Sequence, residues 1–124
     1  MKDDDLARTL QEALGAHFAW KTRLRRAVDS QAAEVTVDSV RRDDCCVLGK
    51  LLHHELPGDQ RSGDHYGPAL DLHRQFHLTA ADALGLALAG KGPEATAIID
   101  GRFSELSAAL GAVLMKWRQQ AMKG

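Results

Sequence analysis

Histidine and cysteine side chains give this sequence its strongest chemical signal. The 124-residue chain holds six histidines and two cysteines, and the cysteines, Cys45 and Cys46, are adjacent. His73 and His77 are four residues apart, so on a helix they lie one turn apart and can both reach a single metal ion. Taken alone, each histidine could instead be a core residue with a hydrogen-bonded ring, because leaving a buried polar group unpaired costs about 1–3 kcal/mol.

His17 and Cys46 can complete a ligand set with the histidine pair. A Cys46 thiolate as fourth ligand would close a tetrahedral His₃Cys shell and leave no position for a substrate. Imidazole and thiolate suit Zn²⁺, whereas Mg²⁺ and Ca²⁺ prefer oxygen ligands. Residues 73–77 read His-Arg-Gln-Phe-His and lack the glutamate that zinc proteases place after their first histidine. The sequence therefore predicts a zinc site rather than an enzyme.

Three long helical segments would position these ligands. Apolar residues recur at alternating spacings of three and four over residues 5–28, 66–89 and 94–121, which indicates helices with one buried face. His17 lies on the buried face of the first segment, and the histidine pair lies on that of the second. The buried face of the third segment is expected to comprise Ile99, Phe103, Leu106, Leu110, Val113, Trp117 and Gln120.

A shorter helix should carry the cysteine ligand. We expect an extended connector over residues 34–44, and then a helix over residues 45–55 with Asp43 or Asp44 as its N-cap. The predicted fold is an all-α, antiparallel four-helix bundle with three long helices and one short helix. At this length, residues 1–124 should form a single domain.

Charge and hydropathy exclude several classes of partner. Sixteen Lys and Arg against 17 Asp and Glu give a net charge of −1, which argues against a nucleic-acid binder or a basic membrane anchor. No stretch approaches the roughly 18 apolar residues of a membrane-inserted helix, and residues 1–5 lack the basic start of a secretory signal. We expect a cytoplasmic protein with reduced thiols.

Three motifs together resemble the chemoreceptor zinc-binding (CZB) domain family. They are His-x-x-Trp at residues 17–20, Cys-x-Leu-Gly-x-Leu at residues 46–51, and His-x-x-x-His at residues 73–77. The resemblance extends over residues 10–117. Leu51 stands where the family usually has tryptophan, a departure that concerns packing around the short helix rather than the metal ligands.

The resemblance implies a bacterial cytoplasmic signalling domain that binds one zinc ion through His17, Cys46, His73 and His77. Domains of this family are attached to chemoreceptors or diguanylate cyclases, or occur alone, and they sense zinc or oxidants such as hypochlorous acid through the ligand cysteine. The resemblance also favours a homodimer. We expect the chain to act on a separate signalling protein, from a chemoreceptor or cyclase pathway, to act through self-association, or to serve as a zinc- or oxidant-responsive module. Trp20 is expected to shield the site.

Two functions are open for a zinc site of this kind, a sensor and a structural site. If the short helix is weakly anchored, oxidation of Cys46 or removal of zinc would let residues 45–52 shift. The alternative is a purely structural zinc-stabilised bundle used for protein interaction. A phosphotransfer bundle would need an exposed histidine, and a di-iron bundle would need inward glutamates, so both are disfavoured. The sequence identifies neither the partner nor the stimulus, and it assigns no role to Cys45, His53, His54 and His65, the last three of which should be solvated.

Overall fold

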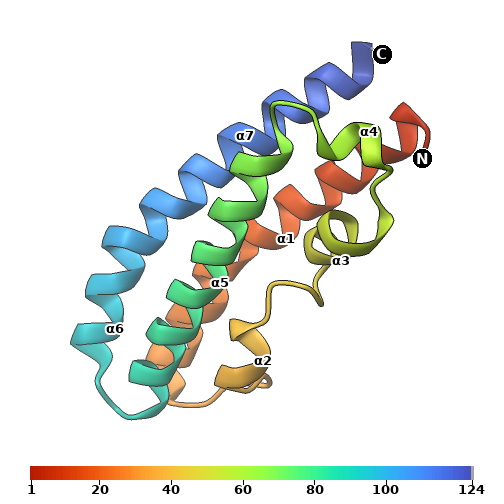
Figure 1. Cartoon of the computed structure of the whole chain (residues 1–124). Coiled ribbons are helices and arrows are strands. Elements are labelled where there is room, and N and C mark those ends of the chain that lie inside the picture. The colour runs from red at the N-terminus through yellow and green to blue at the C-terminus, as the bar shows by residue number, and fades with distance from the viewer. Residues whose placement is uncertain (124) are drawn as a thin grey trace.

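Three long helical rods build the frame of the molecule. The computed structural model describes residues 1–123. Its rods are α1 (Asp3–Ser30), α5 (Tyr66–Leu88), and a third formed by α6 (Gly92–Ile98), the π-helical segment η2 (Ile99–Phe103) and α7 (Ser104–Lys123). α1 and α5 run in the same direction and the third rod returns against both, so the two termini lie at the same end (Figure 1). The predicted all-α bundle is confirmed.

The fourth member of the bundle follows α1 and precedes α5 in the chain, and it is broken into short pieces (Figure 1). They are α2 (Val37–Arg41), α3 (Val47–Lys50), the π-helical segment η1 (Leu51–Glu55) and α4 (Gly58–Arg61). The short helix predicted for the cysteine ligand therefore exists, as α3 continued by η1.

Helix α2 occupies part of the segment that the sequence predicted as an extended connector. Thr36 accepts the backbone N–H of Ser39 at 3.1 Å, and Ser39 in turn accepts the N–H of Thr36 at 3.2 Å. This capping box satisfies two backbone donors and starts a helical turn. Val40 is buried in that turn and anchors it to the core. The extended-connector prediction for residues 34–44 is wrong here because the local cap and the burial of Val40 favour a helix.

Gly101 interrupts the third rod, which the sequence predicted as one continuous helix. Its φ of −97° and ψ of −105° lie outside the helical region. Beyond it the buried face also differs from the prediction, because Leu114 is buried while Val113 is half-buried and Gln120 is exposed. A straight helix has 3.6 residues per turn, so its buried face drifts away from the strict heptad spacing used for the prediction.

The short α3–η1 segment is firmly held in the core. Leu48, Leu51 and Leu52 are each 0% exposed, and α3 packs against α1. Burying each leucine contributes about 1.5–3 kcal/mol of stabilisation. The premise that this helix is weakly anchored is therefore wrong.

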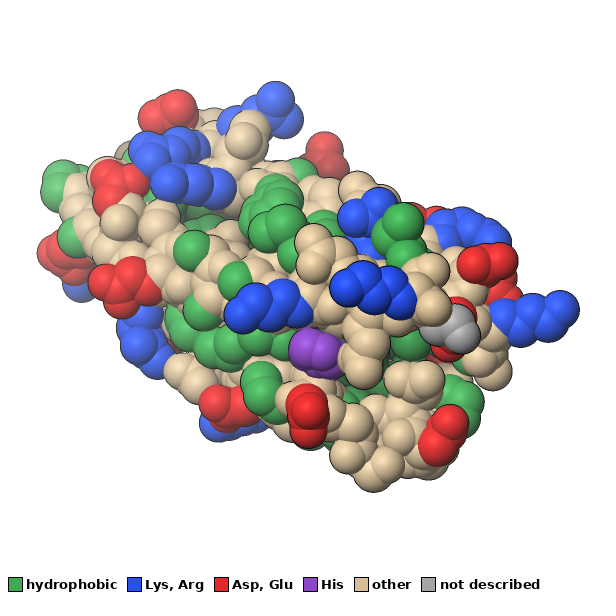
Figure 2. Space-filling model, turned by 90° about the horizontal axis from the view of Figure 1, so that it is seen from above, with side chains coloured by type: hydrophobic (Ala, Val, Ile, Leu, Met, Phe, Trp, Pro, Cys, Tyr) green, Lys and Arg blue, Asp and Glu red, His purple; other side chains and the backbone are tan. Residues whose placement is uncertain are grey.

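The molecular surface mixes charges of both signs. Figure 2 shows acidic and basic side chains interspersed with small apolar areas on the face seen from above. Among the described residues, no helix combines the length and apolar character that a membrane crossing requires.

Candidate metal centre

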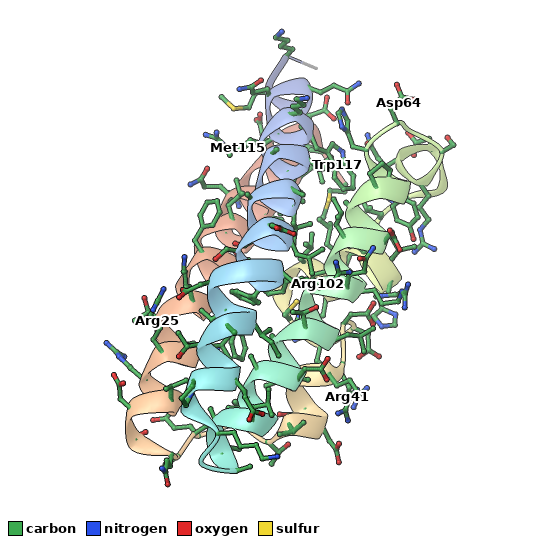
Figure 3. The ribbon with its side chains drawn as sticks, turned by 90° about the vertical axis from the view of Figure 1, so that its left-hand side faces the viewer. Arg25, Arg41, Asp64, Arg102, Met115 and Trp117 are labelled. Atoms are coloured by element: carbon green, nitrogen blue, oxygen red, sulfur yellow. The ribbon has the colours of Figure 1, made fainter. Side chains whose placement is uncertain are left out.

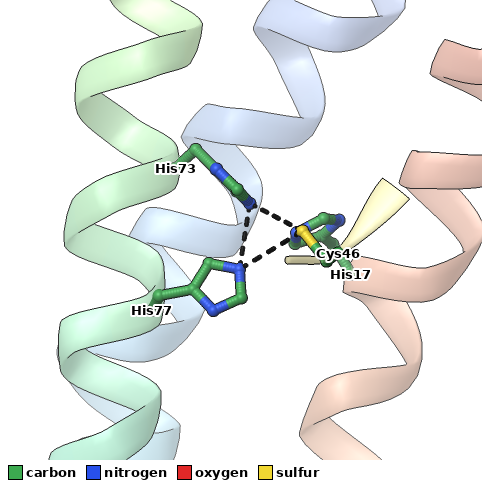
Figure 4. Close-up of side chains that lie close together, drawn as sticks. All are labelled: His17, Cys46, His73 and His77. Atoms are coloured by element: carbon green, nitrogen blue, oxygen red, sulfur yellow. Dashed lines mark hydrogen bonds between the residues drawn. The ribbon is translucent and has the colours of Figure 1, made fainter. Parts of the chain in front are cut away.

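All four predicted ligand side chains meet inside the bundle, where α3 approaches α1 and α5 (Figure 4). Their ligand atoms lie within 4.8 Å of one another. The Cys46 sulfur is 3.9 Å from Nε2 of His17, 3.2 Å from Nε2 of His73 and 3.6 Å from Nε2 of His77. The two α5 histidines bring their Nε2 atoms to 2.9 Å. The fold thus joins residues from three elements at one point.

Backbone carbonyls fix the orientation of two of the imidazoles. Nδ1 of His17 donates to the carbonyl of Ala13 at 2.7 Å, and Nδ1 of His77 donates to the carbonyl of Val40 at 2.8 Å. Because a carbonyl oxygen can only accept, each Nδ1 carries the hydrogen and each Nε2 keeps a free lone pair. Both lone pairs are therefore available to a metal ion.

Sequence reasoning missed both of these acceptors. Ala13 precedes His17 by four residues on the same helix, so its carbonyl could have been identified from the sequence. Val40 lies 37 residues from His77, and no sequence signal links them. Only the folding of α2 against α5 brings them together.

His73 is held differently from the other two histidines. The side chain is 0% exposed, and its Nδ1 has no hydrogen-bond partner within residues 1–123. Its ring is instead packed edge-on against His77 and His17, with centroid separations of 4.5 and 5.0 Å. Packing, rather than a carbonyl, sets the orientation of this ring.

Burial keeps the three imidazoles uncharged. Desolvation lowers the pKa of His17 to about 4, against a smaller opposing effect of its hydrogen bond to Ala13. Desolvation, followed by repulsion from His77, lowers the pKa of His73 to about 2. The pKa of His77 is also lowered, again chiefly by burial. At neutral pH all three rings are in the neutral form that binds metal cations.

Cys46 lies at the start of α3, as its N-cap. Its sulfur accepts the backbone N–H of Gly49 at 3.3 Å. The prediction that Asp43 or Asp44 caps this helix is wrong, because the helix begins only at Val47 and the Asp44 carboxylate pairs with a neighbouring arginine. Burial raises the pKa of the Cys46 thiol, and the N–H of Gly49 acts in the opposite direction.

Gly49 lets the turn before α3 fold back onto the helix. A Cβ at this position would collide with the backbone carbonyl of Asp43, and no side-chain rotation could relieve that contact. The close approach places residues 43–46 so that the Cys46 sulfur points at the histidines.

The donor set and its spacing fit a zinc ion. Zinc binds imidazole nitrogen at about 2.0–2.1 Å and thiolate sulfur at about 2.3 Å, so the ligand atoms of a tetrahedral shell lie roughly 3.3–3.7 Å apart. The separations from the Cys46 sulfur, 3.2–3.9 Å, bracket that range, and the 2.9 Å between the Nε2 atoms of His73 and His77 lies below it. Three neutral nitrogens and one sulfur also match the preference of Zn²⁺, and no carboxylate belongs to the cluster.

An aromatic residue that sequence reasoning did not single out packs beside the cluster. Phe76 is fully buried, with its ring centroid 4.9 Å from that of His17 and 5.7 Å from that of His77. Its position three residues after His73, on the same face of α5, was the available signal. Trp20 is half-buried one turn beyond His17 and lies under the Arg23 guanidinium. That it shields the metal site stays a prediction.

Two histidines outside the cluster are less exposed than the sequence suggested. His53 is half-buried with Nε2 3.5 Å from an Asp43 carboxylate oxygen, and His65 stacks on Trp117 at 6.2 Å between centroids. Both contacts come from residues distant in sequence, which is why the prediction of solvated rings is wrong for them. His54 is exposed, as predicted.

Comparison with protein families places part of the chain in a known family. Residues 17–84, more than half of the chain, match the chemoreceptor zinc-binding domain. The matched range begins at His17 and contains the other three residues of the cluster. Comparisons with curated proteins and with solved structures find no match.

Proposed function

The chain belongs to the chemoreceptor zinc-binding domain family, and from that membership we propose that it is a sensory module that holds one zinc ion through His17, Cys46, His73 and His77. The observation that carries the proposal is the convergence of their four ligand atoms within 4.8 Å. The neutral histidines and the carbonyl-held Nδ1 atoms support it, because both leave nitrogen lone pairs available. Bound zinc would supply the positive charge that keeps the cysteine as a thiolate.

Cys46 is the reactive group of the proposed sensor. It is half-buried, whereas the three histidines are buried, and the adjacent Val47 is 40% exposed. In the proposed sensor, the partly exposed position of Cys46 is the route by which a small oxidant reaches the site. With hypochlorous acid, the thiolate takes up the oxygen and the hydrogen to become a sulfenic acid, and chloride leaves. The sulfenic acid is the weaker metal ligand, so oxidation loosens the site.

The response would be concentrated in residues 40–46, which we name the site loop. At one end the Val40 carbonyl accepts from His77, and at the other Cys46 completes the cluster. The leucines of α3 and η1 that follow are fully buried and stay packed. Because Val40 is buried at one end and the leucines at the other, release of Cys46 would free the part of the site loop between them rather than the whole helix.

The proposed module has no catalytic role of its own. Four protein ligands leave no position for a substrate at a tetrahedral ion. Its output would pass to a separate signalling protein or through a homodimer. Light scattering of the zinc-loaded chain tests the dimer directly: a mass near twice 13.5 kDa is expected, and a monomer at all concentrations would contradict it.

A purely structural zinc site is the second candidate, favoured by the deep burial of Leu48, Leu51 and Leu52 beside Cys46. Exchange kinetics separate the two functions. A sensor should yield its zinc to a chelator or a mild oxidant while the bundle stays folded by circular dichroism. A structural site should release zinc only as the chain unfolds.

Metal analysis of the purified chain tests the ligand assignment. We expect one zinc per chain, with loss or marked weakening in His17→Ala, Cys46→Ala, His73→Ala and His77→Ala. His54→Ala is the matched control, because this exposed histidine lies outside the cluster and should keep full zinc content. Undiminished zinc in Cys46→Ala would overturn the His₃Cys assignment.

A further inference from the structure

One cavity of the molecule lies away from the four metal ligands. A cavity of about 230 Å³ opens between the C-terminal half of α1, the connection that follows it and α5. None of the four metal ligands is among its lining residues. We name it the Trp20 pocket, after the side chain that forms one of its walls.

Part of the Trp20 pocket is lined by apolar side chains. Leu24, Ala27 and Leu84 line it and are each at most 2% exposed, and the half-buried Val35 adds another apolar contact. An enclosed apolar cavity of about 150 Å³ is enough to hold a benzene molecule. The pocket therefore has room for a single substituted ring stacked beside the indole.

Two arginines give the rim of the pocket a positive charge. Arg23 and Arg26 both line it, and neither forms an ion pair or a side-chain hydrogen bond within the described part of the chain. The guanidinium of Arg23 lies 3.9 Å above the Trp20 ring, a cation–π contact that fixes its position beside the indole. With Glu34 as the acidic residue of the lining, the formal charge around the pocket is +1.

We propose that the Trp20 pocket binds a small aromatic carboxylate, a function separate from the metal site. The ring lies against the indole and the aliphatic floor, and the carboxylate is bound by the arginines at the rim. Guanidinium groups bind carboxylates through paired hydrogen bonds, so arginines without an internal partner favour this class of ligand over a neutral or cationic one.

The two tryptophans of the chain make the test specific. Trp20 lines this pocket, and Trp117 lines a second cavity of about 320 Å³ beside the acidic Asp3 and Asp59. Trp117 lies toward the opposite end of the bundle from Arg25, as Figure 3 shows. Each indole N–H gives its own NMR signal, which the Trp117→Phe variant assigns. The zinc-loaded chain is titrated with benzoate, benzamide and benzylamine.

Benzoate should shift the Trp20 indole signal saturably and leave that of Trp117 in place. Benzamide and benzylamine should bind at least about tenfold more weakly, because each lacks the carboxylate. A Trp117 response to benzoate, or equal affinity for benzamide, would overturn the proposal. Zinc content, measured on the same samples, tests the proposed zinc site independently.

Single-charge variants locate the carboxylate. Arg23→Gln and Arg26→Gln should each weaken benzoate binding several-fold. Arg25→Gln is the matched control, because it removes the same charge from the same helix. Arg25 pairs with Asp100 at 2.6 Å and does not line the pocket. If Arg25→Gln weakened binding as much as the other two variants, general surface charge would explain the attraction and the proposal would fail.

Discussion

The two sides of the metal cluster are built in opposite ways. His17, His73 and His77 lie within long helices, are buried, and have ring positions set by carbonyls or neighbouring rings. Cys46 ends the site loop, a partly exposed turn in which Asp44 pairs with Arg42 and the Asp43 carboxylate lies 3.5 Å from Nε2 of His53. The histidine side is a buried part of the core, whereas the cysteine side is partly exposed; in the proposed sensor it is this side that moves without unfolding the bundle. A sensor needs both properties, because a fixed reference is what makes a local displacement detectable.

The largest expected effect tests the rigidity of the histidine side. Phe76→Ala removes a fully buried ring that packs against His17, His77 and Phe103, and should lower the free energy of unfolding by about 3–5 kcal/mol. Urea denaturation measures it. Phe18→Ala, at a ring that is 49% exposed, is the control and should cost much less. Similar losses in both variants would mean that the histidines are not part of a tightly packed core.

The second-largest expected effect is a pH dependence of the stability, which the buried histidines cause. Burial lowers the folded-state pKa of His17 to about 4 and of His73 to about 2, below the value of 6.5 of an unperturbed histidine. Below pH 6.5 the unfolded chain therefore binds protons that the folded chain does not. The metal-free protein should lose stability as the pH falls, by about 1 kcal/mol per pH unit for each such histidine, until the folded-state pKa is reached.

Urea unfolding in the presence of a chelator, at a series of pH values, measures this slope. The His73→Gln variant should have a shallower slope, whereas His54→Gln, which changes an exposed ring, should keep the slope of the parent. A stability that is constant from pH 7 to pH 5 would contradict the buried, neutral state of the histidine side.

On the cysteine side we expect a smaller loss of stability together with a clear loss of zinc affinity. In Gly49→Ala the new Cβ collides with the Asp43 carbonyl and must displace the site loop. We expect zinc affinity to fall at least about tenfold, while the free energy of unfolding falls by only about 1–3 kcal/mol. Competition with a zinc chelator measures the affinity. Gly15→Ala, where a Cβ meets no atom within 4 Å, should leave zinc affinity unchanged.

The smallest effect separates the two adjacent cysteines. Cys45 is exposed, and its thiol donates to the Asp44 carboxylate at 3.3 Å, which raises the pKa of that thiol. Cys45→Ser should therefore change stability by less than about 0.5 kcal/mol and leave zinc content and oxidant-triggered zinc release intact. If release by hypochlorous acid required Cys45, the reactive sulfur would have been assigned to the wrong residue.

Local pattern was a good guide to the long helices and a poor one to the segment between them. α1 and α5 follow from apolar residues at helical spacing, and their observed ends differ from the expected ones by at most two residues. The chain between them contains α2, a capping box and a glycine that contacts another backbone segment. These features have short or non-local signals, so periodicity cannot detect them.

The sequence by itself determined which four side chains form the cluster: helical spacing places His73 and His77 on one face and His17 on another buried face, and the family motif singles out Cys46. The tertiary structure alone decided how the rings are oriented and kept neutral. Val40 reaches His77 only when α2 packs on α5, and the low pKa values require a core that excludes water. Periodicity is a property of one helix, whereas hydrogen bonding and desolvation at a site depend on every element that surrounds it.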